Sequence, residues 1–239
     1  MDNSKEIKQE LEKVYHLISY EFGSPVNSLK VMADLVMTDA VATGNGLIAE
    51  SARYMYSQVE QLQQRLRNLI FWADLNVKNY TFKPVGVNVD LVLTKLITDF
   101  TDIAGLKGIL IIPYAPQGLL VNADLPMLTL LLQNILSNAV KFSRKGDTIE
   151  VTAHRLPAAD SVQVTVRDTG VGMGPAKLAA VFNPSRRNTG RGTANEPGLG
   201  LGLVVAQAIL TLHGHTLQLI SEPNLGTTVI IELPTATAS

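Results

Sequence analysis

The chain has 239 residues, of which 46% are hydrophobic and 17% are charged, with a formal net charge of -1. This length allows one large or two ordinary domains, and this composition predicts a packed core and excludes global disorder. The balanced charge gives no indication of a nucleic-acid partner, and the absence of cysteine excludes disulfides and thiolate metal sites.

No apolar run approaches the ~18 residues that a membrane-spanning helix needs. The charged start of the chain, which includes Asp2, Lys5, Glu6 and Lys8, is not typical of a signal peptide. We therefore expect a cytoplasmic protein. Any membrane attachment would come from segments outside this sequence, as in the cytosolic part of a membrane-bound sensor.

Residues 1–77 predict two long helices joined at Thr43–Gly46, because apolar residues recur there at steps of three and four. The first apolar seam contains Leu11, Val14, Ile18, Phe22, Pro25, Leu29, Met32 and Val36. The second seam contains Met55, Val59, Leu62, Leu66, Leu69 and Ala73. A single hairpin cannot bury both seams, so we expect a homodimer that forms a four-helix bundle. An intramolecular coiled-coil spacer is the alternative.

Residues 78–89 read as a linker with one short strand, and residues 90–239 read as a second domain. Short β-rich runs alternate there with helical ones, which predicts an α/β sandwich with a mixed sheet and an α+β chain as a whole. The expected strands are 85–89, 109–112, 148–153, 162–167, 216–220 and 227–233. The expected helices are 90–103, 126–142, 175–180 and 202–213.

Three motifs in this second domain suggest a ligand site. Asp168, Gly170 and Gly172 directly follow an alternating strand, where a carboxylate can accept a hydrogen bond from an exocyclic amine and glycine lets the backbone approach a ligand. Ordinary turn chemistry is the alternative for this motif alone. The second motif places three polar residues on one helix face, and the third is a glycine-rich turn that opens a helix and offers N–H groups to phosphate. These two motifs comprise Asn134, Asn138 and Lys141, and Gly198, Gly200, Gly202 and Leu203.

In this order the motifs resemble the N, G1 and G2 boxes of the histidine kinase ATPase family, whose nucleotide fold is shared with gyrase, MutL and the large heat-shock chaperones. The resemblance implies ATP and Mg²⁺ as ligands, with Asp168 as the adenine anchor, Asn138 as the Mg²⁺ ligand and Lys141 as a phosphate contact. Asn134 stands where gyrase-type ATPases have a glutamate that activates water. Because an amide cannot act as a base, we expect slow ATP hydrolysis.

The polar stretch between Phe182 and Gly198 resembles the ATP lid of the same family. Arg187 and Arg191 in this stretch are the expected phosphate contacts. A solvated loop is the alternative for each arginine.

Ser19–Pro25 in the first helix resembles the H box of histidine kinases, in which Ser-His-Glu-Xaa-Arg-Thr-Pro is usual. Tyr20 occupies the phosphoacceptor position and Glu21 follows it in register. A phenol has a pKa of about 10, and a carboxylate with a pKa of about 4 is a poor base for it. His16, one turn earlier, is an alternative acceptor, although a histidine packed in the bundle or exposed to solvent is the favoured interpretation.

Two interpretations follow from this departure. In the first, the chain is a two-component kinase core whose usual phosphorelay to a response regulator is blocked or altered. In the second, it is a non-catalytic, ATP-binding pseudokinase scaffold that regulates a partner histidine kinase or response regulator. A serine kinase of the anti-sigma type is disfavoured, because such proteins lack the two-helix dimerisation region.

Overall fold

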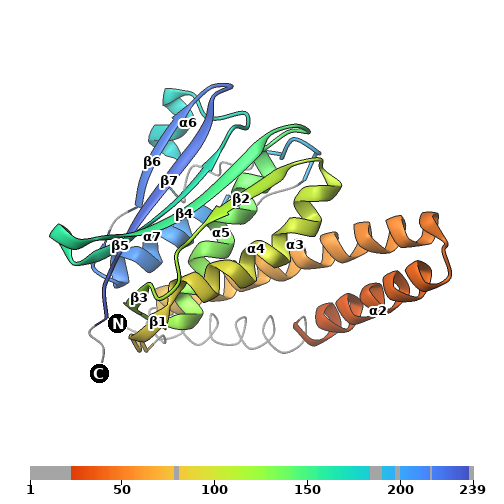
Figure 1. Ribbon diagram of the computed structural model, residues 1–239, viewed down its shortest axis with the longest axis horizontal. Helices are drawn as coiled ribbons and strands as arrows, with labels where there is room; N and C mark the ends of the chain where they lie inside the picture. Colours follow the sequence, from red (N-terminus) through yellow and green to blue (C-terminus); the bar gives the residue numbers. More distant parts are fainter. Residues whose placement is uncertain (1–22, 78–80, 184–189, 197–199, 216, 237–239) are drawn as a thin grey trace, which may run out of the picture. The chain divides into compact units, whose positions relative to one another are not determined.

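The computed structural model describes residues 23–77, 81–183, 190–196, 200–215 and 217–236. The chain divides into two compact units, residues 1–80 and residues 81–239, and each is described by itself (Figure 1). Within the described residues, no helix is long and apolar enough to cross a membrane. Four of the predicted site residues lie outside the described residues, namely Tyr20, Glu21, Arg187 and Gly198.

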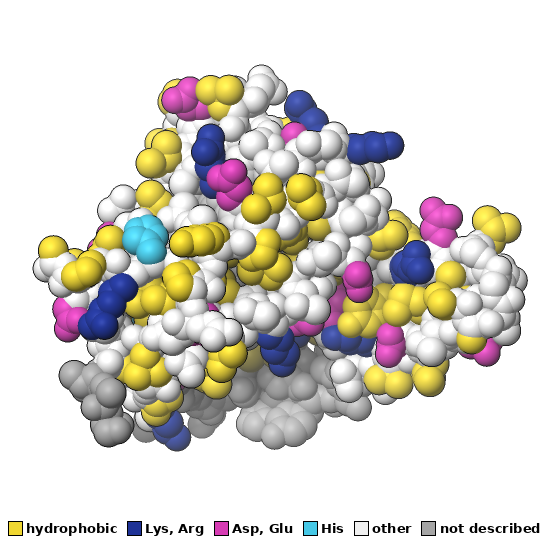
Figure 2. Space-filling model, in the orientation of Figure 1, with side chains coloured by type: hydrophobic (Ala, Val, Ile, Leu, Met, Phe, Trp, Pro, Cys, Tyr) yellow, Lys and Arg dark blue, Asp and Glu magenta, His cyan; other side chains and the backbone are white. Residues whose placement is uncertain are grey.

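The first unit is a helical hairpin of α2 (Gly23–Ala42) and α3 (Gly46–Val77). Small side chains make much of its interior, because four of its eight buried residues in the described part are alanines, namely Ala33, Ala40, Ala49 and Ala52. Several larger residues of the predicted seams stay exposed, with exposed fractions of 60% at Met32 and 41% at Leu62. Apolar side chains are visible on the surface of the hairpin in Figure 2. The predicted helical hairpin is confirmed, and part of its apolar seams remains exposed in the described residues.

A mixed five-stranded sheet forms the frame of the second unit. Its order is β2 (Leu110–Tyr114), β4 (Thr148–Leu156), β5 (Ser161–Asp168), β7 (Gly226–Pro234) and β6 (Leu217–Glu222). Only β2 and β4 pair in parallel, and the other neighbours are antiparallel. The mixed sheet was predicted. A separate ribbon of β1 (Val85–Asn88) and β3 (Leu120–Ala123) adds a strand, β3, that the sequence patterns did not indicate.

Three long helices cover one face of this sheet: α4 (Val89–Leu106), α5 (Leu125–Phe142) and α7 (Gly202–Leu212) (Figure 1). The short helix α6 (Pro175–Ala180) and a 3₁₀ turn (Pro157–Ala159) complete the unit. The strands alternate buried and more exposed residues, so Ile149 and Val151 of β4 and Val164 and Val166 of β5 face the core. A sheet with one buried face explains this period of two.

Asp124 joins three elements of the second unit. Its Oδ1 atom accepts the Met127 N–H at 3.2 Å and so caps α5, while its Oδ2 atom accepts the Lys83 N–H at 3.0 Å. Its own N–H donates to Nε2 of His213 at 3.1 Å, and Nδ1 of His213 lies 2.9 Å from the Ile209 carbonyl. Phe82 packs edge-on against the imidazole, with ring centroids 4.8 Å apart. His213 therefore links the end of α7 to the start of α5.

Candidate functional site

Asp168 ends β5 with a buried, oriented carboxylate. Its Oδ1 atom accepts the N–H groups of Gly170 at 3.0 Å and Thr227 at 3.2 Å. Within the described part of the chain, no hydrogen bond falls on Oδ2. Burial raises the pKa of Asp168 to about 6, although the two backbone donors lower it and the charge of Asp147 adds a small increase. One oxygen is thus fixed by the protein, and the other is left for a ligand.

Close backbone contacts require glycine at two positions after Asp168 and at one position on the neighbouring strand β7. A Cβ atom on Gly170 would lie 2.4 Å from the Phe142 carbonyl oxygen. Gly172 has a φ of +60°, and a Cβ there would lie 1.9 Å from the Glu222 carbonyl oxygen. Gly226 has a φ of +97°, and a Cβ there would lie 1.9 Å from the Asp168 carbonyl oxygen. The loop after β5 is therefore interlocked with the end of α5 and with the β6–β7 turn.

Gly226 and Thr227 were not among the predicted site residues. Gly226 leaves the Asp168 backbone room, and Thr227 donates a hydrogen bond to the Asp168 carboxylate. The glycine-threonine pair after a predicted turn was visible in the sequence. Its contact with Asp168, 59 residues away, depends on the antiparallel pairing of β5 with β7.

The polar face of α5 meets the start of α7. Asn134 is buried and Asn138 is half-buried, and both lie against Gly202. A Cβ atom at Gly202 would approach Asn134 Oδ1 to 3.3 Å and Asn138 Nδ2 to 3.5 Å, so glycine keeps the two helices close. The helix α7 begins at Gly202 and Leu203, after Gly200 with a φ of +70°, and it has no side-chain cap. The structure therefore brings these members of the second and third motifs together.

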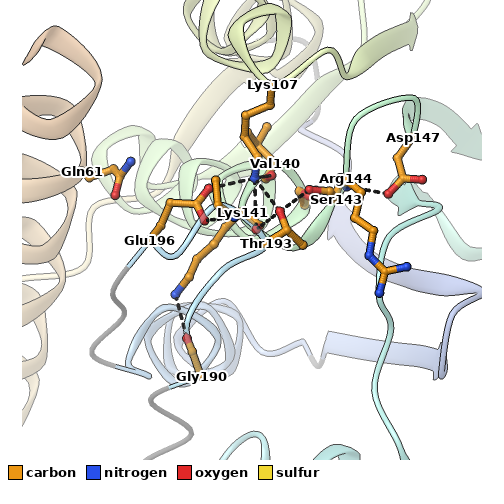
Figure 3. Close-up of polar contacts among 12 residues, drawn as sticks. Gln61, Lys107, Val140, Lys141, Ser143, Arg144, Asp147, Gly190, Thr193 and Glu196 are labelled. Carbon is orange, nitrogen blue, oxygen red and sulfur yellow. Dashed lines mark hydrogen bonds and ion pairs between the residues drawn. The ribbon is translucent and has the colours of Figure 1, made fainter. Parts of the chain in front are cut away.

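The last four carbonyl groups of α5 all accept hydrogen bonds, and three of them have partners from distant segments. Ala139 O accepts the N–H and hydroxyl of Ser143, and Phe142 O accepts the Val171 N–H at 3.1 Å. Val140 O accepts the Lys107 ammonium at 2.7 Å, and Lys141 O accepts the Thr193 N–H at 3.0 Å (Figure 3). Helix ends leave four such carbonyls without partners inside the helix. Here they connect α5 to three other segments, which the sequence patterns did not predict.

Residues 190–196 form a compact turn, although the polar stretch that contains them was read as a loop. Gly192 N–H donates to Glu196 O at 2.8 Å, and Asn195 N–H donates to Gly192 O at 3.0 Å. The Arg191 guanidinium donates to Asn195 Oδ1 at 2.7 Å. Lys141 Nζ donates to Gly190 O at 3.2 Å. Arg191 and Lys141, two of the expected phosphate contacts, thus interact with this segment.

Residues 123–237 match the model of the "histidine kinase-, DNA gyrase B-, and HSP90-like ATPase" family. This segment belongs to that family. Among similar curated proteins, the non-motile and phage-resistance protein of Caulobacter vibrioides is 26% identical over 91% of this chain and 26% of its own length. The sensor-like histidine kinase SenX3 of Mycobacterium tuberculosis is 25% identical over 91% of this chain and 52% of its length. The chain thus spans about a quarter to a half of these relatives.

Solved structures of histidine kinases share the fold of this chain. Full-length ShkA in complex with AMPPNP gives a TM-score of 0.66 at 23% identity, covering 97% of this chain and 46% of ShkA. The catalytic domain of ThkA gives 0.55 at 20% identity, covering 64% of this chain and 97% of that domain. The chain has the architecture of a sensor histidine kinase catalytic core, a helical hairpin followed by a mixed α/β domain.

Proposed function

We propose that the chain binds ATP through its second unit, with the adenine on Asp168. The observation that carries this proposal is the carboxylate geometry: Oδ1 is fixed by two backbone donors, and Oδ2 is left for a ligand within the described residues. With a pKa of about 6, the carboxyl group is mostly ionised at pH 7 and accepts hydrogen bonds only. The exocyclic amine of adenine supplies the matching donor. Family membership and the AMPPNP complex of ShkA support this choice.

The phosphates and Mg²⁺ would lie between α5 and the start of α7. Asn138 would ligate Mg²⁺, because its half-buried amide carries an oxygen of the hard type that this cation prefers. Mg²⁺ would neutralise phosphate charge when bound. Lys141 would exchange the Gly190 carbonyl for a phosphate oxygen, and the uncapped N–H groups from Gly202 onward would face the same anion.

The hairpin is proposed to form a homodimer. Leu29 and Met32 of the first seam, and Met55 and Leu62 of the second, are exposed in a single chain. Association of two hairpins removes these seams from water, and the free energy gained is proportional to the apolar area that is buried. A response regulator or a partner histidine kinase would then be the further partner, as expected of a two-component signalling core.

Two activities fit this arrangement, and the residue at position 20 separates them. The first is a kinase that transfers the γ-phosphate of ATP. In this activity Tyr20 would take the phosphoacceptor position with Glu21 beside it, and Arg187 and the glycine-rich turn at Gly198 would contact the phosphates. The second is an ATP-binding pseudokinase scaffold, which the tyrosine at the phosphoacceptor position favours. A phenol is almost entirely protonated at pH 7 and is a weak nucleophile without a matched base.

Incubation of the full chain with γ-labelled ATP, followed by acid and base treatment, distinguishes the two activities. We expect no acid-labile label, because no histidine occupies the phosphoacceptor position. Label that survives both treatments would identify phosphotyrosine and a competent kinase. Acid-labile label that maps to His16 would make that histidine the acceptor and refute the scaffold.

A further inference from the structure

Lys107, at the end of α4, makes a buried junction that none of the three nucleotide motifs contains. Its ammonium donates to Val140 O at 2.7 Å, to Glu196 Oε1 at 2.8 Å and to Thr193 Oγ1 at 2.9 Å (Figure 3). A lysine ammonium has three N–H donors, so each has an acceptor. The side chains of Lys107 and Glu196 are only 15% and 11% exposed. One charge pair therefore connects α4, the end of α5 and the turn at 192–196.

The turn Gly192–Glu196 is held against α5 by further contacts. The second oxygen of Glu196, Oε2, accepts the Ala194 N–H at 2.8 Å, which closes the turn. Thr193 donates its N–H to Lys141 O at 3.0 Å and its hydroxyl to Ser143 O. A Cβ atom on Gly192 would lie 2.8 Å from Lys141 O, so the turn lies directly on the α5 backbone. The position of this turn is thus fixed by Lys107, Glu196 and a glycine.

This junction lies at the proposed phosphate end of the site, and among the described contacts it shares no hydrogen bond with the Asp168 carboxylate. The turn rests on Lys141, the expected phosphate contact, and a few residues later Gly202 packs on Asn134 and Asn138. The Asp168 carboxylate is held by Gly170 and Thr227, and neither interacts with Lys107 among the described contacts. A change at Lys107 should therefore alter the phosphate end and leave the adenine end intact.

We propose that Lys107, with Glu196 as its counter-ion, is a positioning residue that places the Gly192–Glu196 turn and Lys141 for the terminal phosphate of ATP. This role rests on the proposed function. Lys107 does not touch the nucleotide in this proposal and acts through the turn. Loss of the junction should weaken binding of a triphosphate more than binding of a diphosphate, because only the triphosphate extends to the turn.

The test is calorimetric titration of Mg-AMPPNP and Mg-ADP into the full chain and four variants. Lys107→Met removes the ammonium, and Gly192→Ala keeps it but displaces the same turn, because the added Cβ would lie 2.3 Å from Glu196 Oε2 and 2.6 Å from Lys141 Cγ. We expect each to weaken AMPPNP binding by about tenfold or more, which corresponds to the loss of one charge-assisted hydrogen bond, and to change ADP binding by less than about twofold. Lys95→Met, on the exposed side of α4, is the control and should bind both nucleotides like the parent.

Hydrogen exchange without nucleotide provides the second measurement. The amides of Gly192, Thr193 and Ala194 should lose protection in both variants, while those of β5 should keep it. Equal weakening of AMPPNP and ADP, or no weakening of either, would overturn the positioning role and leave ATP binding in place. A parent chain that binds neither nucleotide would refute the proposed function and the positioning role together. Lys107→Arg, which keeps the charge with a different donor geometry, should recover part of the AMPPNP affinity.

Discussion

Substitution of Asp168 by asparagine should weaken nucleotide binding and stabilise the empty protein at the same time. Burial raises the pKa of this carboxyl group from 3.8 to about 6, so the folded state binds a proton more tightly than the unfolded state does. The contribution of Asp168 to the free energy of unfolding is therefore fully present below pH 3.8, and it is lost as the pH rises through about 6. A shift of about two pKa units corresponds to about 3 kcal/mol by linkage.

The asparagine side chain of Asp168→Asn would be neutral at every pH and would keep an oxygen for the N–H groups of Gly170 and Thr227. The free energy of unfolding of this variant should therefore equal that of the parent near pH 4 and exceed it by up to about 3 kcal/mol near pH 8. The amide would turn a donor toward the adenine amine, so ATP binding should weaken by about 1.5–3 kcal/mol, or roughly ten- to a hundredfold.

Urea unfolding without nucleotide, monitored by circular dichroism at each pH, measures the difference in the free energy of unfolding. Calorimetric titration measures the loss of ATP affinity. The parent and the variant are compared at the same pH, so titration of all other groups cancels. Asp99→Asn, on an exposed face of α4, is the matched control and should show no such trend. A stability difference that is independent of pH would show that the buried charge is not its cause. Unchanged ATP affinity in Asp168→Asn would refute the adenine assignment.

Four other variants have expected outcomes. Gly226→Ala should lower the free energy of unfolding by at least about 3 kcal/mol, because its Cβ would overlap the Asp168 carbonyl. Gly214 has a φ of +77° and open space around it, so Gly214→Ala should cost only about 1–2 kcal/mol. Urea unfolding of both variants shows whether the steric overlap or the backbone angle dominates. The double change Met32→Lys and Leu62→Lys should convert a dimer to monomers in sedimentation at tens of micromolar, on the order of typical assay concentrations, because it places charges in the apolar seam; a parent that is itself monomeric would contradict the proposed bundle. Tyr20→His should gain acid-labile phosphate from labelled ATP, since an imidazole is largely neutral and nucleophilic at pH 7; a variant that binds ATP and stays unlabelled would favour the scaffold.

Periodicity identified most of the fold, because the long helices of the second unit and the central strands of its main sheet each bury one face. The three-four pattern of Met55, Val59 and Leu62 predicted α3, and the alternation of Val162, Val164 and Val166 predicted β5. The strand β3 was missed because it is defined by its pairing with β1, which lies more than 30 residues earlier in the chain. Strand pairing of this kind depends on the tertiary structure.

The candidate site was predicted where a motif is local and missed where it is assembled from distant segments. The spacing of Asn134 and Asn138 along one helix already placed both on one face. Lys107 contacts Glu196, which lies 89 positions away in the sequence. Thr227 contacts Asp168, which lies 59 positions away. No composition or spacing rule indicates which lysine satisfies the carbonyls at the end of a helix. That assignment requires the path of the chain.

The contacts around Asp124 connect the start of the second unit to the helices α5 and α7. One carboxylate oxygen of Asp124 accepts the Lys83 N–H, and the other accepts an N–H of the first turn of α5. The Asp124 N–H donates to His213 at the end of α7. The opposite end of α7 rests on Asn134 and Asn138 at Gly202. Through these contacts α7 connects the glycine at position 202 to the segment at Phe82 and Lys83. We expect a displacement of Gly202 to alter the protection of the Lys83 amide in hydrogen exchange.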